Sequence, residues 1–416
     1  EYAMRIGEAL HCEIRPSIFH RKNYFYPDMP KDYQVSQYDE PINVDGWLEL
    51  PDGTRVGIER AHMEEDTGKT THVGGGGRIH DANYSLVDYN RAGVPLVEIV
   101  ARPDLRGADG ARAYVDELRG ILVATGASDG KMEEGSLRVD ANVSVRKTGL
   151  TELGTRCEIK NMNSLRSLGR AIEYEARRQV DELDAGNRIV QETRHWNEAE
   201  GRTTSMRSKE EAFDYRYFPE PDLVPVVPDA AWIEAVRAAL PPMPADRRAA
   251  VAAAVGEGAP IDAVATVVVL GLDTLVLDAA VAGADARLAL NRVANELATD
   301  PAAARRLEPA VFAKAVTMEG DGRLTATQSK AVLAELLASG GDPEEIAKAR
   351  GFEAMSSDSL TIAVDAVLAE HPDEARRLAE GDGKMMGFFV GKVMAATGGK
   401  ADGKAVTGLL RGRTAE

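Results

Sequence analysis

Acidic side chains gather on one face of a predicted pair of strands. In residues 137–145 apolar residues alternate with polar ones, which is the period of a strand with one buried face. A second alternating run, residues 156–160, follows after a loop short enough for a hairpin. Asp140 and Glu158 would then be diagonal neighbours on the polar face, at roughly 7–8 Å. This spacing predicts a divalent cation between the two carboxylates.

Further charged residues lie close to these two acids in the sequence. Arg138 and Lys160 fall on the same polar face, where they could hold an anionic ligand. Residues 62–69, His-Met-Glu-Glu-Asp-Thr-Gly-Lys, place three carboxylates before a glycine and a lysine. Glu98 interrupts an apolar run of the kind found in buried strands, so we expect it to meet a cation, a metal or hydrogen-bond donors. Singly, each acid could equally be solvated or paired with an arginine; together they predict a metal or phosphate site.

Other familiar motifs do not fit. Gly68-Lys69-Thr70 resembles the end of a P-loop, but that motif requires glycine where Met63 stands. His62 is a candidate site residue, although its distances to the next histidines match no common metal motif. Neither Cys12 nor Cys157 has a local partner that would mark a nucleophile. Covalent catalysis is therefore not the favoured mechanism.

Composition indicates where the protein works. The net charge is −17, only two cysteines occur, and no apolar window approaches the roughly 18 residues of a membrane span. We therefore expect a reduced, cytoplasmic protein with no membrane partner and no signal peptide. The charge is reversed in residues 384–416, which contain six basic residues and two acids. This tail could contact a phosphate backbone or could be a solvated helix surface, and its candidate contacts are Lys392, Lys400, Lys404 and Arg411.

Three regions differ in their residue patterns. Residues 1–240 are rich in strand-like alternation and contain all the acid clusters. They also contain an amphipathic helix at 164–183, capped by Asn163 or Ser164, that is predicted to bury Leu168, Ile172, Ala176, Val180 and Leu183. Prolines 241, 242 and 244 end this region, and residues 241–345 read as a helical domain. Residues 346–416 read as a small domain of short helices. The predicted fold class is α+β, with a β-rich cradle, a helical domain and a helical tail.

Six ordered segments of the chain resemble one protein family, the B subunits of the bacterial aspartyl/glutamyl-tRNA amidotransferases. The resemblance is carried by residues 21–28, 62–69, 88–100, 132–144, 158–164 and 215–222. It continues through the helical region to residues 391–394, so it covers essentially the whole chain.

This resemblance implies a component of a tRNA-dependent amidotransferase. Such a protein uses ATP and Mg²⁺ to phosphorylate the side-chain carboxylate of mischarged Glu-tRNA(Gln) or Asp-tRNA(Asn). Ammonia from an amidase-type glutaminase, the A subunit of such complexes, then displaces the phosphate, and a small C subunit braces the pair. The reaction needs no enzyme nucleophile, only a metal and positively charged groups around the phosphate. The alternative is a non-catalytic protein that binds tRNA and supports the amidase partner.

The resemblance also assigns roles to individual residues. It points to Glu65, Glu98, Asp140 and Glu158 as magnesium ligands. Lys69, Arg138 and Lys160 become candidate clamps for phosphate or carboxylate, although they could instead balance the neighbouring acids. The small tail domain becomes the tRNA contact. The family carries a further glutamate and histidine of the metal site in an N-terminal strand absent from this sequence, so we expect a segment before Glu1.

Overall fold

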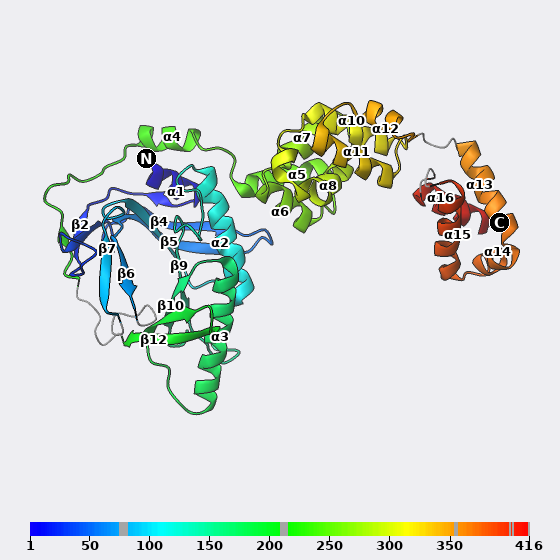
Figure 1. The fold of residues 1–416 in the computed structure, drawn as a ribbon. Coiled ribbons are helices and arrows are strands. Elements are labelled where there is room, and N and C mark those ends of the chain that lie inside the picture. Colours follow the sequence, from blue (N-terminus) through cyan, green and yellow to red (C-terminus); the bar gives the residue numbers. More distant parts are fainter. Residues whose placement is uncertain (75–81, 209–214, 353–356, 399–400, 402, 415–416) are drawn as a thin grey trace. The chain divides into compact units, whose positions relative to one another are not determined.

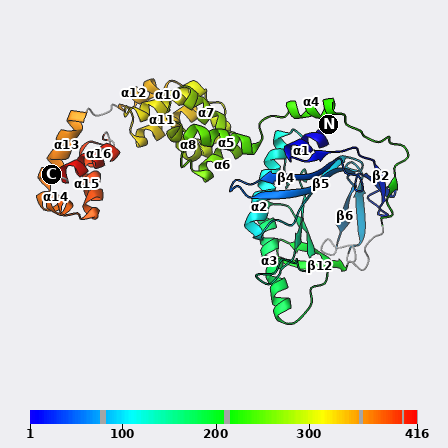
Figure 2. The same cartoon turned by 180° about the vertical axis from the view of Figure 1, so that it is seen from behind.

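A computed structural model describes residues 1–74, 82–208, 215–352, 357–398, 401 and 403–414. The chain divides into two compact units, Glu1–Ala245 and Asp246–Glu416. Strands lie in the first unit and the second is helical, as Figures 1 and 2 show from opposite sides. The predicted α+β class is confirmed.

The first unit contains three sheets and four helices among its described residues. Its helices are α1 (Tyr2–Ala9), α2 (Gly107–Ala124), α3 (Leu165–Asp184) and α4 (Ala230–Ala238). Its strands are β1 (Glu13–Ile14), β2 (His20–Asn23), β3 (Tyr33–Ser36), β4 (Asn43–Glu49), β5 (Arg55–Glu65), β6 (Lys69–Val73), β7 (Tyr84–Asp88), β8 (Pro95–Ala101), β9 (Val139–Val143), β10 (Cys157–Met162), β11 (Glu192–Asn197), β12 (Arg202–Ser208) and β13 (Phe218–Pro219).

The long strand β5 is the centre of the largest sheet. This sheet has the order β1-β4-β5-β3-β2-β13, and β8 pairs with β5 outside that path. β6 and β7 form a separate two-stranded sheet, and β12-β11-β10-β9 form a four-stranded sheet. The pairing of β9 with β10 is antiparallel, as predicted for the two alternating runs. β10 and β11 are parallel because the chain crosses between them through α3.

Helix α3 forms where the amphipathic pattern predicts it. Ser164 is its N-cap, and the Ser164 hydroxyl accepts a hydrogen bond from the backbone N–H of Ser167. Leu168 is buried, but Val180 and Leu183, which were expected in the core, are exposed. The helix extends beyond the surface that it covers, so its last turns bury less than their apolar residues suggest.

Strand β8 corrects a second expectation. The apolar run around Glu98 predicted a strand buried on both faces. Val97 and Ile99 do pack against the core, but the side chain of Glu98 on the opposite face is 51% exposed. β8 pairs with β5 alone among the described strands, so it is an edge strand, and Leu96 and Val100 on the face of Glu98 are only partly buried. The prediction failed because apolar neighbours on both sides of a residue do not show that both faces of a strand are covered.

The second unit has two separate hydrophobic cores. The first core is built from residues between Val251 and Ala347, and the second from residues between Leu360 and Leu410. The division into three domains at 240 and 345 stays a prediction. The helices of this part are α5 (Pro244–Val255), α6 (Ile261–Val269), α7 (Asp273–Val281), α8 (Ala286–Asn295), the 3₁₀ helix η4 (Leu297–Thr299), α9 (Pro301–Ala304), α10 (Pro309–Gly320), α11 (Ala326–Ser339), α12 (Pro343–Ala349), α13 (Ser357–Glu370), α14 (Pro372–Ala379), α15 (Gly383–Ala396) and α16 (Gly403–Thr414).

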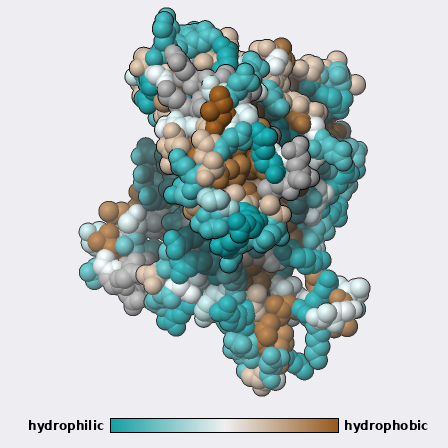
Figure 3. Space-filling view, turned by 90° about the vertical axis from the view of Figure 1, so that its right-hand side faces the viewer, coloured by the Kyte–Doolittle hydropathy of each residue, from teal (hydrophilic) through white to brown (hydrophobic). Residues whose placement is uncertain are grey.

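No single helix in the described part of the chain has the length and apolar composition needed to cross a membrane. One pair of helices, α6 and α7, meets that test only jointly, with a bend of 109° between them. The face drawn in Figure 3 is mainly hydrophilic, with hydrophobic side chains in scattered patches.

Candidate active site

The four-stranded sheet brings together the two acids that the alternation predicted. Glu158 on β10 is opposite Asn142 on β9, which makes Asp140 its diagonal neighbour. The Lys160 ammonium lies between the two carboxylates, with Nζ 2.6 Å from Asp140 Oδ2 and 3.4 Å from Glu158 Oε1. A positive charge therefore occupies the place where a divalent cation was predicted.

The two acids stabilise the charge of Lys160. Burial alone would lower the pKa of Lys160, but Asp140 and then Glu158 outweigh it, so the pKa is raised and the ammonium is retained. Glu158 is also held from the neighbouring parallel strand, where the Thr193 hydroxyl donates a hydrogen bond of 2.9 Å to Glu158 Oε2. These contacts fix both carboxylates in orientations that converge on one cation.

An irregularity in β10 contributes to this arrangement. The register with β9 shifts between Ile159 and Met162, and Asn161 adopts a left-handed conformation with φ of 72°. Asparagine tolerates this conformation better than most residues. Its amide Nδ2 donates to the Trp196 carbonyl oxygen at 3.2 Å and lies 3.3 Å from His195 Nε2. The bulge therefore has support from the next strand, β11.

A second cluster forms in the largest sheet. His62 and Glu64 are two residues apart on β5 and share a face, and Glu98 on β8 is opposite His62. His62 Nε2 lies 3.5 Å from Glu98 Oε2 and 3.9 Å from Glu64 Oε2. One ligand atom from each of the three residues falls within 4.8 Å of the others. One imidazole and two carboxylates at this spacing could hold a divalent cation.

Burial makes the case for an ion in this second cluster. The side chain of His62 is completely buried, yet neither ring nitrogen has a hydrogen-bond partner among the described residues. An unsatisfied buried imidazole is costly, and a metal ligand bond would satisfy one nitrogen. The second cluster, with its buried histidine, therefore fits a divalent metal, and in the first cluster the Lys160 ammonium takes the position of a cation between two carboxylates.

Residues from distant segments complete the second cluster. Lys22 Nζ on β2 lies 3.1 Å from Glu64 Oε1 and 5.0 Å from the centre of the Tyr215 ring. Burial alone would raise the pKa of Glu64, but His62 and Lys22 outweigh it and hold the pKa below its ordinary value. Burial and the nearby Glu64 raise the pKa of Tyr217, so its phenol stays neutral.

Glu65, a predicted magnesium ligand, points away from this cluster. It follows Glu64 on β5, and successive side chains of a strand point to opposite faces. Its carboxylate receives a hydrogen bond of 2.9 Å from the backbone N–H of Val35 and lies 2.5 Å from Lys31 Nζ. The structure does not bring Glu65 together with Glu98, and Glu64 takes that place.

The predicted clamps are not all near the acids of the first cluster. Arg138 precedes β9, and its Nη2 lies 2.6 Å from Oδ2 of the buried Asp66, which follows β5. This ion pair joins the largest sheet to the four-stranded sheet. Lys69 is exposed at the start of β6, opposite Asp88. Of the three predicted clamps, Lys160 alone contacts Asp140 and Glu158 in the described structure.

The predicted tRNA contacts lie in the helical tail. Lys392 is exposed on α15, with Nζ 5.5 Å from the centre of the Phe388 ring, and Arg411 is exposed on α16. Lys400 lies outside the described residues, as does the side chain of Lys404 on α16. Their role in binding stays a prediction.

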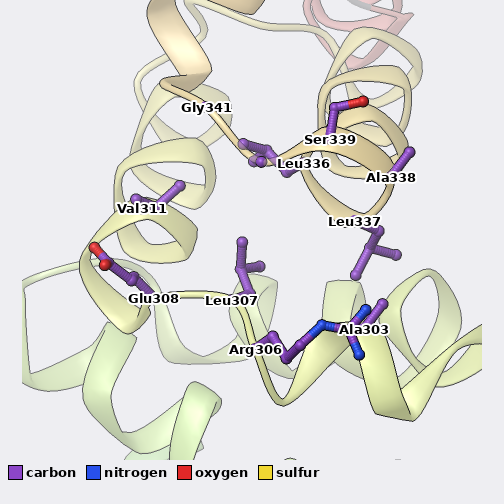
Figure 4. Close-up of a pocket in the computed structure, with 11 residues that line it drawn as sticks. Ala303, Arg306, Leu307, Glu308, Val311, Leu336, Leu337, Ala338, Ser339 and Gly341 are labelled. Atoms are coloured by element: carbon purple, nitrogen blue, oxygen red, sulfur yellow. The ribbon is translucent and has the colours of Figure 1, made fainter.

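A pocket of about 470 Å³ opens in the second unit, between the start of α10 and the end of α11 (Figure 4). Arg306 and Glu308 are the charged residues in its lining, and most of the rest are apolar or small, such as Leu336 and Gly341. It has no cluster of acids or nucleophiles among its lining residues. The acid clusters of the first unit therefore remain the better candidates for chemistry.

Comparison with known proteins agrees with this location. Residues 1–234 match the GatB/GatE catalytic domain family, and residues 275–413 match the GatB domain family. Three relatives share one name, which describes each as the B subunit of an aspartyl/glutamyl-tRNA(Asn/Gln) amidotransferase. The one from Frankia casuarinae is 50% identical, with 98% of this chain and 84% of the relative covered. The one from Thermobifida fusca is 48% identical, with coverage of 97% and 81%.

The third relative, from Carboxydothermus hydrogenoformans, is 45% identical over 100% of this chain and 88% of its own length. Both units of the chain thus fall within matches to one family. The chain belongs to the family of aspartyl/glutamyl-tRNA(Asn/Gln) amidotransferase B subunits, which are components of a tRNA-dependent amidotransferase.

Proposed function

We propose that this chain phosphorylates the side-chain carboxylate of mischarged Glu-tRNA(Gln), Asp-tRNA(Asn) or both. The γ-phosphoryl group moves from ATP to the carboxylate, which gives ADP and an acyl phosphate. Ammonia then attacks the acyl carbon, phosphate leaves, and the amide forms. The observation that supports the proposal is the cluster of His62, Glu64 and Glu98, whose ligand atoms lie within 4.8 Å of one another, in the same unit as the Asp140–Glu158 pair that converges on Lys160.

Magnesium, when bound, would neutralise charge on the phosphates of ATP. His62, Glu64 and Glu98 would hold one ion, and Asp140 and Glu158 would hold another. Lys160 and Lys22 are placed to donate hydrogen bonds to anionic oxygens beside these ions. Arg138 fixes the two sheets relative to each other through Asp66. Positioning of this kind does not require a nucleophile from the protein.

We propose that ammonia comes from an amidase-type glutaminase partner, with a small third protein bracing the assembly in the cytoplasm. The basic residues of the tail would contact tRNA away from the reacting end. The competing proposal is a chain that only binds tRNA and supports the amidase. The relatives' name fits both, and the buried histidine beside two carboxylates favours the catalytic proposal.

The test uses the chain assembled with its two partner proteins. Asp140→Asn and Glu158→Gln should each lower ATP cleavage that depends on mischarged tRNA by several orders of magnitude, because developing phosphate charge loses its cation. Glutamine hydrolysis by the partner should stay largely intact. Asp129→Asn, an exposed acid outside both clusters, serves as the control. Near-normal cleavage by both variants would remove these residues from the mechanism.

A further inference from the structure

Lys160 occupies the centre of a site that the proposed function assigns to a metal. Its ammonium is within 2.6 Å of Asp140 Oδ2 and 3.4 Å of Glu158 Oε1, so both carboxylates are directed at one positive charge. A divalent cation bound by the same two oxygens would come within a few ångströms of the ammonium, at a distance where like charges repel strongly. The two cations cannot share this position.

We propose that the Lys160 ammonium is the resident counter-ion of the Asp140–Glu158 pair and that a divalent cation displaces this ammonium. The bulge at Asn161 fixes the backbone next to Lys160 and so positions the ammonium. The proposal rests on the proposed function only in assigning a metal to this pair. It adds a competition between two cations for one pair of carboxylates.

Lys160 lies where regular pairing with β9 ends and the bulge of β10 begins. In a regular antiparallel pair, one residue of β10 would face Asp140. The register shift between Ile159 and Met162 instead places two residues, Lys160 and Asn161, opposite that part of β9. Asn161 absorbs the extra residue in its left-handed conformation, and the hydrogen bond to the Trp196 carbonyl anchors it to β11.

The competition has a consequence for the order of binding. Two carboxylates and one ammonium leave a net negative charge at the pair, which repels phosphate. A dication reverses the sign, and the displaced ammonium becomes available to donate to an anionic oxygen. Phosphate groups should therefore bind well only after the metal. Lys160 neutralises the two carboxylates when no metal is bound, and it binds the phosphate once the metal is present.

The experiment measures Mn²⁺ binding to the full chain in the absence of ATP and tRNA. Asp140→Asn identifies the Mn²⁺ bound at this pair as the component of binding that the substitution removes. Lys160→Met should tighten that component about tenfold, because no ammonium has to be displaced. Lys160→Arg keeps the charge and should not tighten it. Affinity that is unchanged or weakened in Lys160→Met would overturn the proposal, as would Mn²⁺ binding that Asp140→Asn leaves untouched.

A matched control is present in the second unit. Lys314 Nζ lies 2.7 Å from Asp342 Oδ2 and 3.1 Å from Glu344 Oε2, and its exposure is close to that of Lys160. Lys314→Met removes the same charge from a similar pair of carboxylates. It should leave the Asp140-dependent component unchanged, and an equal tightening would show a general charge effect and contradict the proposal.

The role of the bulge is tested by coupling. Asn161→Gly can keep the left-handed conformation and should preserve the response to Lys160→Met. Asn161→Val disfavours that conformation. In this background Lys160→Met should change the affinity of the Asp140-dependent Mn²⁺ component only slightly. If the effects of Lys160→Met and Asn161→Val on Mn²⁺ affinity were fully additive, Asn161 would not be a positioning residue. Because no ATP is present, failure here is distinguishable from failure of the phosphorylation step, which is measured separately in the assembled complex.

Discussion

Residues of the second cluster differ greatly in how much their substitution would disturb the folded structure. His62 is fully buried and the side chain of Glu64 is nearly so, which means that their substitution would disturb packing as well as chemistry. Glu98 is half exposed and its backbone is fixed by β8, so its carboxylate can be altered with little effect on folding. Glu98 is therefore the residue that separates metal binding from stability.

Glu98→Gln should weaken Mn²⁺ binding at this cluster by about tenfold or more, since a neutral amide replaces an anionic ligand. The free energy of unfolding should change by no more than about 0.5 kcal/mol, as for other exposed positions. Glu59→Gln is the matched control, because Glu59 lies on β5 with the same 51% exposure and forms an ion pair with Arg60, outside the cluster. Equal Mn²⁺ affinity in the two variants would argue against a metal ligand at position 98.

Alternation predicted the first cluster but not the second. Asp140 and Glu158 were found because a two-residue period and a short loop determine which side chains share a face. The same period, applied to β5, groups His62 with Glu64 and excludes Glu65, but the sequence does not say that β8 pairs with β5 and brings Glu98 beside His62. Lys22 and Tyr217 come from segments that only tertiary packing brings together, and no local pattern marks them.

Among the elements, α3 has the polar contacts that join it to the four-stranded sheet. Glu175 is fully buried and accepts hydrogen bonds from Arg178 on the same helix and from the Thr203 hydroxyl on β12. The neighbouring Gln179 donates to Glu175 and to the Val143 carbonyl of β9. The helix is therefore attached to both edge strands of the sheet through one buried acid and one amide.

Glu175→Gln should destabilise the first unit by about 3 kcal/mol at neutral pH, because it removes a fully buried anion from the partly buried Arg178 and Arg194. Burial alone would raise the pKa of Glu175, but Arg178 and Gln179 outweigh it and lower the pKa below its ordinary 4.5. Stability from this group is thus fully present above pH 4.5 and is lost as the pH falls through the lowered pKa. The difference in the free energy of unfolding between wild type and Glu175→Gln should therefore become smaller at acidic pH.

This difference can be followed by urea denaturation at several pH values, with tryptophan fluorescence as the probe. All three tryptophans of the chain, at positions 47, 196 and 232, lie in the first unit and report on it alone. Glu173→Gln, an exposed change on the same helix, is the control. If the difference in the free energy of unfolding between wild type and Glu175→Gln stayed constant down to acidic pH, the charge of Glu175 would not be the cause of the destabilisation.

Elements were predicted well where a pattern was long and regular. The start of α3 follows from Ser164 and the apolar period after it, and β9 and β10 follow from alternation. The exposure of Val180 and Leu183, and of one face of β8, depends on how far neighbouring elements extend. How far neighbouring elements extend is a property of the tertiary structure, and the hydropathy of a single segment does not predict it.

At the scale of the whole molecule, the acid clusters and the basic tail belong to different units. The tail has its own core, from Leu360 to Leu410, while Ile346 and Phe352 pack with the preceding helical core. A deletion that respects both cores therefore begins at residue 357. It removes Lys392, Lys400, Lys404 and Arg411 and leaves the first unit and the preceding helices complete.

Deleting residues 357–416 should weaken tRNA binding and reduce its dependence on salt, because fewer counterions are released from the tRNA backbone. The slope of log affinity against log salt should fall by about 0.7–0.9 for each phosphate that the tail no longer neutralises. Phosphorylation at saturating tRNA should change much less. Unchanged affinity and slope in the deleted complex would mean that the basic tail is only a solvated surface.

The central claim, that this chain makes an acyl phosphate, is tested most directly by trapping that product. The assembled complex is incubated with ATP, Mg²⁺ and Glu-tRNA(Gln) or Asp-tRNA(Asn), without glutamine or ammonia, and hydroxylamine converts the activated carboxylate to a hydroxamate. We predict hydroxamate that requires both ATP and mischarged tRNA and that Asp140→Asn abolishes. A wild-type complex that supports glutamine hydrolysis and binds tRNA but yields no hydroxamate would contradict the account and favour a scaffold.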